Sequence, residues 1–170
     1  MHFVYHFAAD SGTPAASGIR IVSVEKAAEK QRISRSILEA LPEWFGIPEA
    51  REQYIKESAA QPFFAAVDAE KAIGFLCLKE TGKETVELSV MGVLKDYHRR
   101  GVERKLFERA KKVAENSGYS FMQVKTVQMG RYAEYDVTNR FYLSLGFKEF
   151  ELFPTLWDER NPCQIYVMSL

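Results

Sequence analysis

The sequence has no excess of charge of either sign, few cysteines and histidines, and no long hydrophobic run. Its 170 residues include 23 Lys and Arg and 23 Asp and Glu, so the formal net charge is zero. This balance excludes the global basic field on which a general nucleic-acid-binding protein relies. No apolar run approaches the ~20 residues that span a bilayer, so we expect a cytoplasmic protein without membrane contacts.

Ligands for metals and partners for disulfides are equally scarce. The two cysteines, Cys77 and Cys163, each lie in an apolar, strand-like run, which favours two reduced, buried thiols. Their spacing alone leaves a disulfide between them open. The histidines, His2, His6 and His98, are not grouped with cysteines or carboxylates at metal-ligand spacing. We therefore expect no metal.

The first 18 residues differ in composition from the rest. A short aromatic start is followed by small and turn-forming residues, AADSGTPAASG, and it lacks the basic start and long apolar centre of a signal peptide. We expect residues 1–18 to be an added tag and linker or an N-terminal extension outside the fold. The remaining residues, 19–170, have the length of a single domain.

From Ile19 the hydrophobic pattern alternates between strand and helix periods. It predicts, in chain order, a strand at 19–24, helices at 25–41 and 48–60, strands at 63–69, 72–80 and 85–93, a helix at 102–117, a strand at 120–127, a loop at 128–136, a helix at 137–145, and strands at 147–153 and 163–169. Short polar links between the three central strands indicate an antiparallel meander. The mixture of elements indicates an α/β domain.

The most informative segment is residues 85–107, where a strand leads through a basic turn into a helix. The first N–H groups of a helix lack internal partners, and the helix dipole adds partial positive charge there. Gly101 lets the backbone approach a diphosphate, while His98, Arg99 and Arg100 add donors and charge. The alternative is a solvated basic turn that caps a core helix. The motifs GxxxxGK[ST] and GxGxxG are both absent.

This segment resembles the signature [RQ]-x-x-G-x-[GA] of the GNAT superfamily of acetyltransferases. The matching residues are His98, Arg99, Arg100, Gly101, Val102 and Glu103. A second hallmark of that family, an asparagine followed by Y-x-x-x-G-F, is matched by Asn139 and by Tyr142 to Phe147. The two motifs occur in the family's order and at its separation, and the resemblance covers about residues 19–170.

The resemblance implies an α/β (α+β) fold with a mixed, mostly antiparallel, splayed central sheet flanked by helices. It implies acetyl-CoA as the acyl donor, lying in a V-shaped gap between the fourth and fifth strands. The pantetheine arm would pair with the backbone near Met91 and Val93. The pyrophosphate would lie on the amides of residues 99–104, which adds Arg104 to the motif residues. Asn139 and Tyr142 would face the other side of the donor.

Two motif positions depart from the family's pattern. His98 stands where the family prefers arginine or glutamine, and it can still donate a hydrogen bond. Glu103 stands where the family has glycine or alanine, and its carboxylate would repel an anionic pyrophosphate by roughly 1 to 4 kcal/mol, depending on the dielectric. We therefore expect weakened but not abolished binding of CoA.

Tyr142 and Glu87 are the predicted catalytic residues. By resemblance, Tyr142 would act as the general acid that protonates the departing thiolate; the alternatives are an aromatic that only packs or one that only orients the thioester. Glu87 lies six residues before Val93, as the glutamate base does in some members. The two-residue strand period would place Glu87, Ser89, Met91 and Val93 on one face. Glu87 could instead bind the substrate's cation or order a water that removes the proton.

The expected function is N-acetyl transfer from acetyl-CoA to a primary amine of a small molecule or of a peptide or protein. The alternative is a non-catalytic acyl-CoA-binding or sensing module on the same fold. Aromatic residues are expected to wall the acceptor site, on the link between the early helices and on late loops: Trp44, Phe45, Tyr132, Tyr135 and Trp157, with Asp158 beside them. We expect no nucleic-acid partner, and the resemblance leaves a homodimer open.

Overall fold

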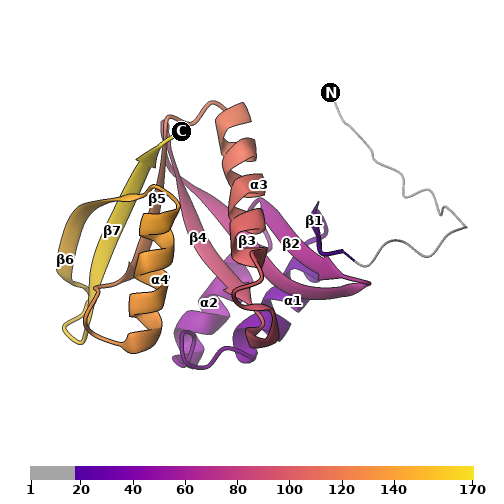
Figure 1. The fold of residues 1–170 in the computed structure, drawn as a ribbon, viewed down its shortest axis with the longest axis horizontal. Coiled ribbons are helices and arrows are strands. Elements are labelled where there is room, and N and C mark those ends of the chain that lie inside the picture. The colour runs from indigo at the N-terminus through magenta and orange to yellow at the C-terminus, as the bar shows by residue number, and fades with distance from the viewer. Residues whose placement is uncertain (1–17) are drawn as a thin grey trace, which may run out of the picture.

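The computed structural model describes residues 18–170, so the segment expected to be a tag or extension lies, except for Gly18, outside the described residues. The chain runs through β1 (Arg20–Ser23), α1 (Ala27–Glu39), α2 (Pro48–Ser58), β2 (Phe63–Asp68), β3 (Lys71–Gly82), β4 (Thr85–Val93), the single-turn helix η1 (Lys95–Tyr97), α3 (Val102–Asn116), β5 (Phe121–Val127), α4 (Ala133–Ser144), β6 (Lys148–Asp158) and β7 (Asn161–Ser169) (Figure 1).

A seven-stranded sheet in the order β1-β2-β3-β4-β5-β7-β6 forms the centre of the molecule. Every neighbouring pair is antiparallel except β4 and β5, which are parallel. Helices α3 and α4 cover the face toward the viewer in Figure 1, and α1 and α2 lie behind the sheet. The predicted mixed, mostly antiparallel sheet flanked by helices is therefore confirmed.

Each face of the sheet has its own hydrophobic core. On the front face, α3 buries a stripe at helical spacing that includes Val102, Leu106 and Ala110, and this stripe packs on β3 to β5. On the other face, α1 contributes Ile37 and Leu38 to a second core with the strand residues Phe63 and Phe75 and with Ile55 of α2. Below, these are called the α3–α4 side and the α1–α2 side of the sheet.

The parallel strands β4 and β5 separate after only four residue pairs. They pair from Thr85 and Phe121 to Leu88 and Val124, although β4 continues to Val93 and β5 to Val127. Ser89 is an extra residue at this point, because Leu78 of β3 faces Leu88 while Cys77 faces Val90. Such a bulge bends its strand. The split that the resemblance implied between the fourth and fifth strands thus begins at the bulge.

The bulge corrects one prediction about side-chain directions. Leu88 belongs to the core on the α3–α4 side, so its neighbour Glu87 points to the α1–α2 side. After the extra residue Ser89, Met91 and Val93 also pack on the α3–α4 side. The prediction that these residues share one strand face with Glu87 is wrong, because the inserted residue shifts the two-residue alternation.

Two boundaries late in the chain also differ from the prediction. Helix α4 begins at Ala133 rather than at residue 137, with Glu134 and Asp136 in its first turn, where acidic side chains are favourable. Tyr135 therefore lies on this helix and not on a loop. Strands β6 and β7 form a long hairpin in place of the predicted loop at 154–162, with Asp158 accepting hydrogen bonds from the turn. Trp157 and Asp158 accordingly end an edge strand.

Two glycines of β3 give a test of how tightly β3 and β4 approach each other. A Cβ atom at Gly74 would lie 2.8 Å from Cγ2 of Val93 and 3.0 Å from the Gly92 carbonyl oxygen, whereas one at Gly82 would meet nothing within 4 Å. We predict that Gly74→Ala lowers the free energy of unfolding by about 1–3 kcal/mol. Gly82→Ala is the matched control and should change it by less than about 0.5 kcal/mol. Urea denaturation measures both, and equal effects would contradict this account of the close approach.

Candidate active site

The N-terminus of α3 forms an open cluster of hydrogen-bond donors beside the split. Gly101 precedes the helix with a φ of 75°, a left-handed conformation that favours glycine, and Arg99 has a φ of 61°. The first backbone bond of the helix runs from the Lys105 N–H to the Gly101 carbonyl at 3.1 Å. The N–H groups of residues 102–104 therefore have no acceptor within residues 18–170. This geometry fits an anionic group such as a diphosphate.

His98 is directed toward β4 rather than toward the helix. Its Nε2 atom lies 2.7 Å from the carbonyl oxygen of Val93, and because a carbonyl only accepts, Nε2 carries the proton. The edge of the ring also meets Trp44, with centroids 5.9 Å apart. His98 thus ties the basic turn to the end of β4. This contact does not support its predicted role as a phosphate donor, because the Nε2 donor is already used.

The end of β4 directs backbone groups into the split. Val93 is paired with Gly74 of β3. The hydrogen bond between the strands is made by the neighbouring pair, from the Leu94 N–H to the Ile73 carbonyl at 2.8 Å. By the alternation of an antiparallel ladder, the N–H and C=O of Val93 and Met91 point away from β3. The Val93 carbonyl is bound by His98, so the two N–H groups and the Met91 carbonyl are the ones left to the split. A ligand with amide groups can pair there as an additional strand would.

Tyr142 of α4 lies in the core on the α3–α4 side with only 6% of its surface exposed. Its ring contacts Phe141 and Phe147, with centroids 5.8 and 5.9 Å away. Burial raises the pKa of the Tyr142 hydroxyl, which therefore stays protonated at neutral pH. No other residue in the described part of the chain hydrogen-bonds to this hydroxyl, so the proton is available to a ligand.

Asn139 was predicted to contact the donor, and its geometry corrects that expectation. The side chain is completely buried. Its Nδ2 donates to the carbonyls of Val127 at 2.9 Å and Tyr135 at 2.7 Å, and its Oδ1 accepts from the Tyr166 hydroxyl at 2.7 Å. These bonds join α4 to the end of β5 and to Tyr166 within β7. Asn139 therefore positions α4, and with it Tyr142, instead of contacting a ligand.

On the α1–α2 side, Glu87 stands at the vertex where the strands part. Its Oε2 atom accepts hydrogen bonds from Lys125 Nζ at 2.8 Å and from Gln123 Nε2 at 2.9 Å, both on β5. The pKa of the nearby Tyr54 is raised, mainly by burial and to a smaller extent by the negative charge of Glu87. The same kind of burial raises the pKa of Cys163 to about 11, so this thiol is neutral. Glu87 is thus a hydrogen-bonded, ion-paired carboxylate.

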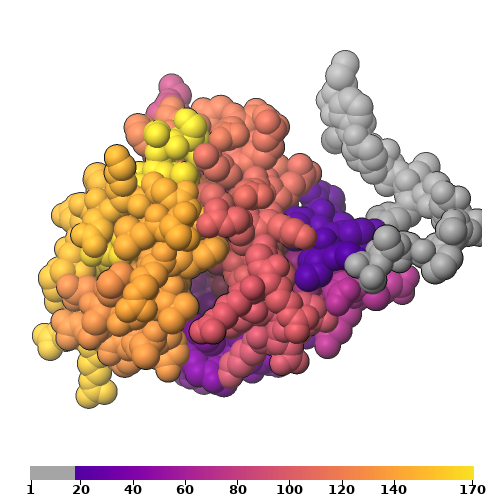
Figure 2. Space-filling model, in the orientation of Figure 1, coloured from indigo at the N-terminus to yellow at the C-terminus, as the bar shows by residue number. Residues whose placement is uncertain are grey.

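The link between α1 and α2 crosses the open end of the split. Trp44 donates from Nε1 to Thr138 Oγ1 of α4 at 3.3 Å, and its carbonyl accepts from the Tyr135 hydroxyl at 2.9 Å. Figure 2 shows a hollow between the orange atoms of α4 and the red atoms of the η1–α3 segment, with purple atoms of earlier elements inside it. Two of the aromatic residues expected near the acceptor, Trp44 and Tyr135, lie beside this hollow. A third, Phe45, packs against Tyr54, which in turn lies near Tyr135.

The cysteines, the possible metal ligands and the end of β6 lie outside this region. Cys77 and Cys163 are both buried and free, as predicted. Within residues 18–170, no three histidine, cysteine or carboxylate side chains come together in a way that could hold a metal ion. None of the described helices has the length and apolar character needed to cross a membrane. Trp157 and Asp158 end the outer strand β6, and both are exposed.

The comparisons with known proteins agree with this geometry. A structure from Desulfovibrio desulfuricans assigned to the GNAT family of acetyltransferases superimposes with a TM-score of 0.75 at 18% identity, covering 89% of this chain and 99% of that one. The ribosomal-protein-S18-alanine N-acetyltransferase of Escherichia coli gives 0.70 at 18% identity, with 89% and 94% covered. A GNAT family acetyltransferase of Elizabethkingia anophelis, solved with acetyl-CoA bound, gives 0.69 at 17% identity, with 88% and 98% covered.

At these identities the similarity shows the fold. The acetyl-CoA bound in the E. anophelis structure supports acetyl-CoA as the co-substrate of proteins with this fold. No protein with a curated description is significantly similar in sequence to this chain. The family model described as an acetyltransferase (GNAT) domain matches residues 59–149, more than half of the chain. The chain therefore belongs to the GNAT acetyltransferase family.

Proposed function

We propose that this protein is an acetyl-CoA-dependent N-acetyltransferase that acetylates a primary amine of a small molecule or of a peptide or protein. The split between β4 and β5 carries the proposal, because it lies between an open helix N-terminus and a protonated tyrosine. Family membership supports the reaction class. The printed name of the E. coli neighbour, an alanine N-acetyltransferase for a ribosomal protein, supports a protein amine as one kind of acceptor.

Residues on the α3–α4 side suit the binding of the donor. The N–H groups of residues 102–104, with Arg99 and Arg104 beside them, would hold the diphosphate. The backbone of Met91 and Val93 would hold the amide-bearing arm. When bound, the donor supplies a thioester whose acyl carbon is electrophilic. Val93 and Met91 also offer N–H groups that can stabilise negative charge developing on the carbonyl oxygen.

Proton transfer in this reaction falls to Tyr142 and Glu87. The hydroxyl of Tyr142 holds a proton at neutral pH and would give it to the departing thiolate. Glu87 would accept the proton of the amine, directly or through a water. Both hydrogen bonds to its carboxylate end on Oε2, and no described residue bonds to Oε1. The Oε1 atom is therefore the one that can accept a hydrogen bond from the substrate amine.

One feature favours the alternative of a non-catalytic acyl-CoA-binding module. Glu103 lies in the first turn of α3, where a diphosphate would sit, and within the described residues no cation forms an ion pair with it. The two functions differ in one result. An enzyme releases CoA thiol in the presence of a suitable amine, whereas a binding module binds acetyl-CoA and releases none. A homodimer and a cytoplasmic location stay predictions.

Tyr142→Phe tests the proposed proton donor. We expect kcat to fall by about 100- to 10,000-fold, because the leaving thiolate loses its acid. The Kd for acetyl-CoA and the melting temperature should change little, since the hydroxyl has no partner within the described residues. Thiol-release kinetics and calorimetric titration measure these quantities. Phe141→Leu, at the neighbouring and less buried ring, is the control. Unchanged kcat in Tyr142→Phe would remove Tyr142 from the chemistry.

Glu103→Gly tests the repulsion at the diphosphate site. Removal of the carboxylate should tighten acetyl-CoA binding by about fivefold or more, which corresponds to roughly 1 kcal/mol of charge repulsion. Glu103→Gln separates the effect of the charge from that of side-chain volume. Glu108→Gln, on the exposed part of the same helix, is the control and should leave the Kd unchanged. Calorimetric titration gives the values, and an unchanged Kd in both Glu103 variants would refute the repulsion.

A further inference from the structure

The side chains around Glu87 carry information about the acceptor. We propose that the acceptor is a zwitterionic amino acid with an apolar side chain, held at its amine by Glu87 and at its carboxylate by Lys125. The inference rests on the proposed function, because it names the acceptor of that reaction. Lys125 would then determine substrate specificity.

The first argument is the unused bonding capacity of the Glu87–Lys125 pair. Among residues 18–170, only one oxygen of Glu87 accepts a hydrogen bond. The Lys125 ammonium has three N–H donors, of which one points to that oxygen at 2.8 Å. Both side chains reach the surface, with 30% of Lys125 and 11% of Glu87 exposed. A ligand can therefore donate to Oε1 and accept from Nζ without breaking the ion pair.

The second argument is the match between this pair and an amino acid. The amine and the carboxylate of an α-amino acid are attached to one carbon, so they present opposite charges side by side. Glu87 and Lys125 do the same on adjacent strands, at the vertex where β4 and β5 part after Leu88 and Val124. A simple amine would use only Glu87. A peptide N-terminus has no carboxylate next to its amine, so it would also leave Lys125 without a partner.

The third argument is that the surrounding charges balance. Lys79 of β3 faces Glu87 in the strand register, and its Nζ donates to Glu57 of α2 at 3.1 Å. Two acids and two lysines thus alternate along this side of the sheet, from Glu57 through Lys79 and Glu87 to Lys125. The neighbouring Cys163 thiol is neutral. Such a row offers no excess negative charge to attract a polycationic amine, but it suits a ligand whose own charges cancel.

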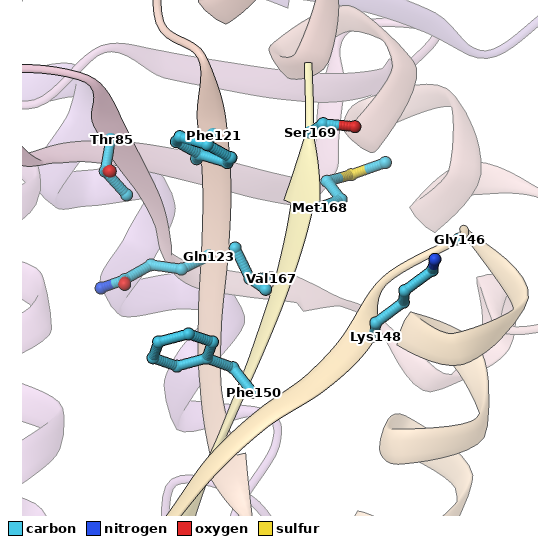
Figure 3. Close-up of a pocket in the computed structure, with 9 residues that line it drawn as sticks. All are labelled: Thr85, Phe121, Gln123, Gly146, Lys148, Phe150, Val167, Met168 and Ser169. Atoms are coloured by element: carbon cyan, nitrogen blue, oxygen red, sulfur yellow. The ribbon is translucent and has the colours of Figure 1, made fainter.

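The fourth argument is an apolar cavity that shares one residue, Gln123, with the surroundings of Glu87. This residue donates to Glu87 and also lines a cavity of about 620 Å³. Figure 3 shows Gln123 between the rings of Phe121 and Phe150, which are 45% and 66% exposed. Val167 and Met168 add further apolar surface to the lining of the cavity. An apolar side chain attached to a zwitterion at Glu87 and Lys125 can extend toward these rings.

The test compares acceptors that differ only by the carboxylate. The pairs are L-phenylalanine with 2-phenylethylamine and L-leucine with 3-methylbutylamine. We expect kcat/KM for each amino acid to exceed that of its amine by at least about tenfold, the effect of one charge-assisted hydrogen bond. Calorimetric titration of the same compounds into the protein saturated with CoA should show the same preference in Kd, without any turnover.

Variants at position 125 assign the preference to the lysine. Lys125→Met should raise KM and Kd for the amino acids about tenfold and leave those for the amines unchanged, and Lys125→Arg should keep the preference. Lys71→Met, which removes an exposed lysine at the start of β3, is the control. Because Lys125→Met leaves the Glu87 carboxylate without its cation, the melting temperature of Lys125→Met is compared with that of the unchanged protein. A native melting temperature together with a lost preference supports the inference.

Three outcomes would overturn the inference: equal or better use of the amines, a preference that survives in Lys125→Met, or tighter binding of a dipeptide such as Phe-Ala than of phenylalanine. Titration with acetyl-CoA separates this failure from that of the proposed function. If acetyl-CoA binds and simple amines release thiol while amino acids do not, only the acceptor assignment is wrong. If acetyl-CoA does not bind, the proposed function is wrong, and the acceptor assignment with it.

Discussion

The arrangement of the whole site depends on one extra residue in a strand. Ser89 interrupts the ladder between β3 and β4 at the position where β4 and β5 stop pairing. A regular β4 would stay hydrogen-bonded to β5 along its length and leave no backbone groups free between them. The bulge bends β4 away, and it also turns Met91 and Val93 to one side of the sheet while Glu87 keeps to the other. The residues proposed for the donor and those proposed for the acceptor thus lie on opposite faces of the sheet.

The remaining parts of the site follow from this separation. The α3–α4 side supplies the helix N-terminus, the free edge of β4 and the buried Tyr142, which together suit a long anionic thioester. The α1–α2 side supplies the Glu87–Lys125 pair and the aromatic residues near α2, which suit a small polar nucleophile. In the proposed reaction, donor and acceptor would therefore approach each other through the split from opposite faces of the sheet.

The sequence was a good guide to the order of elements and a poorer guide to side-chain roles. Periodicity and turn residues predict all seven strands, and the strand–turn–helix pattern around Gly101 predicts the open helix N-terminus. The bulge could not be predicted, because Ser89 is an ordinary strand residue and only its pairing with β3 makes it extra. A motif also identifies residues without giving the directions of their side chains. His98 and Asn139 both match the family's positions. His98, however, bonds to the Val93 carbonyl, and Asn139 is buried in a hydrogen-bond network between α4 and the sheet.

The two crossings of the split set its width. At one end, four residue pairs between β4 and β5 join the halves of the sheet; at the other, Trp44 joins them through Thr138 and Tyr135. Between these points, no backbone hydrogen bond within residues 18–170 joins the two walls of the split. The two halves of the sheet are therefore joined by strand pairing at one end of the split and by the hydrogen bonds of Trp44 at the other. Because two hydrogen bonds join the walls at Trp44 while four strand pairs and a buried core join them at the other end, the tryptophan end is the less firmly held of the two.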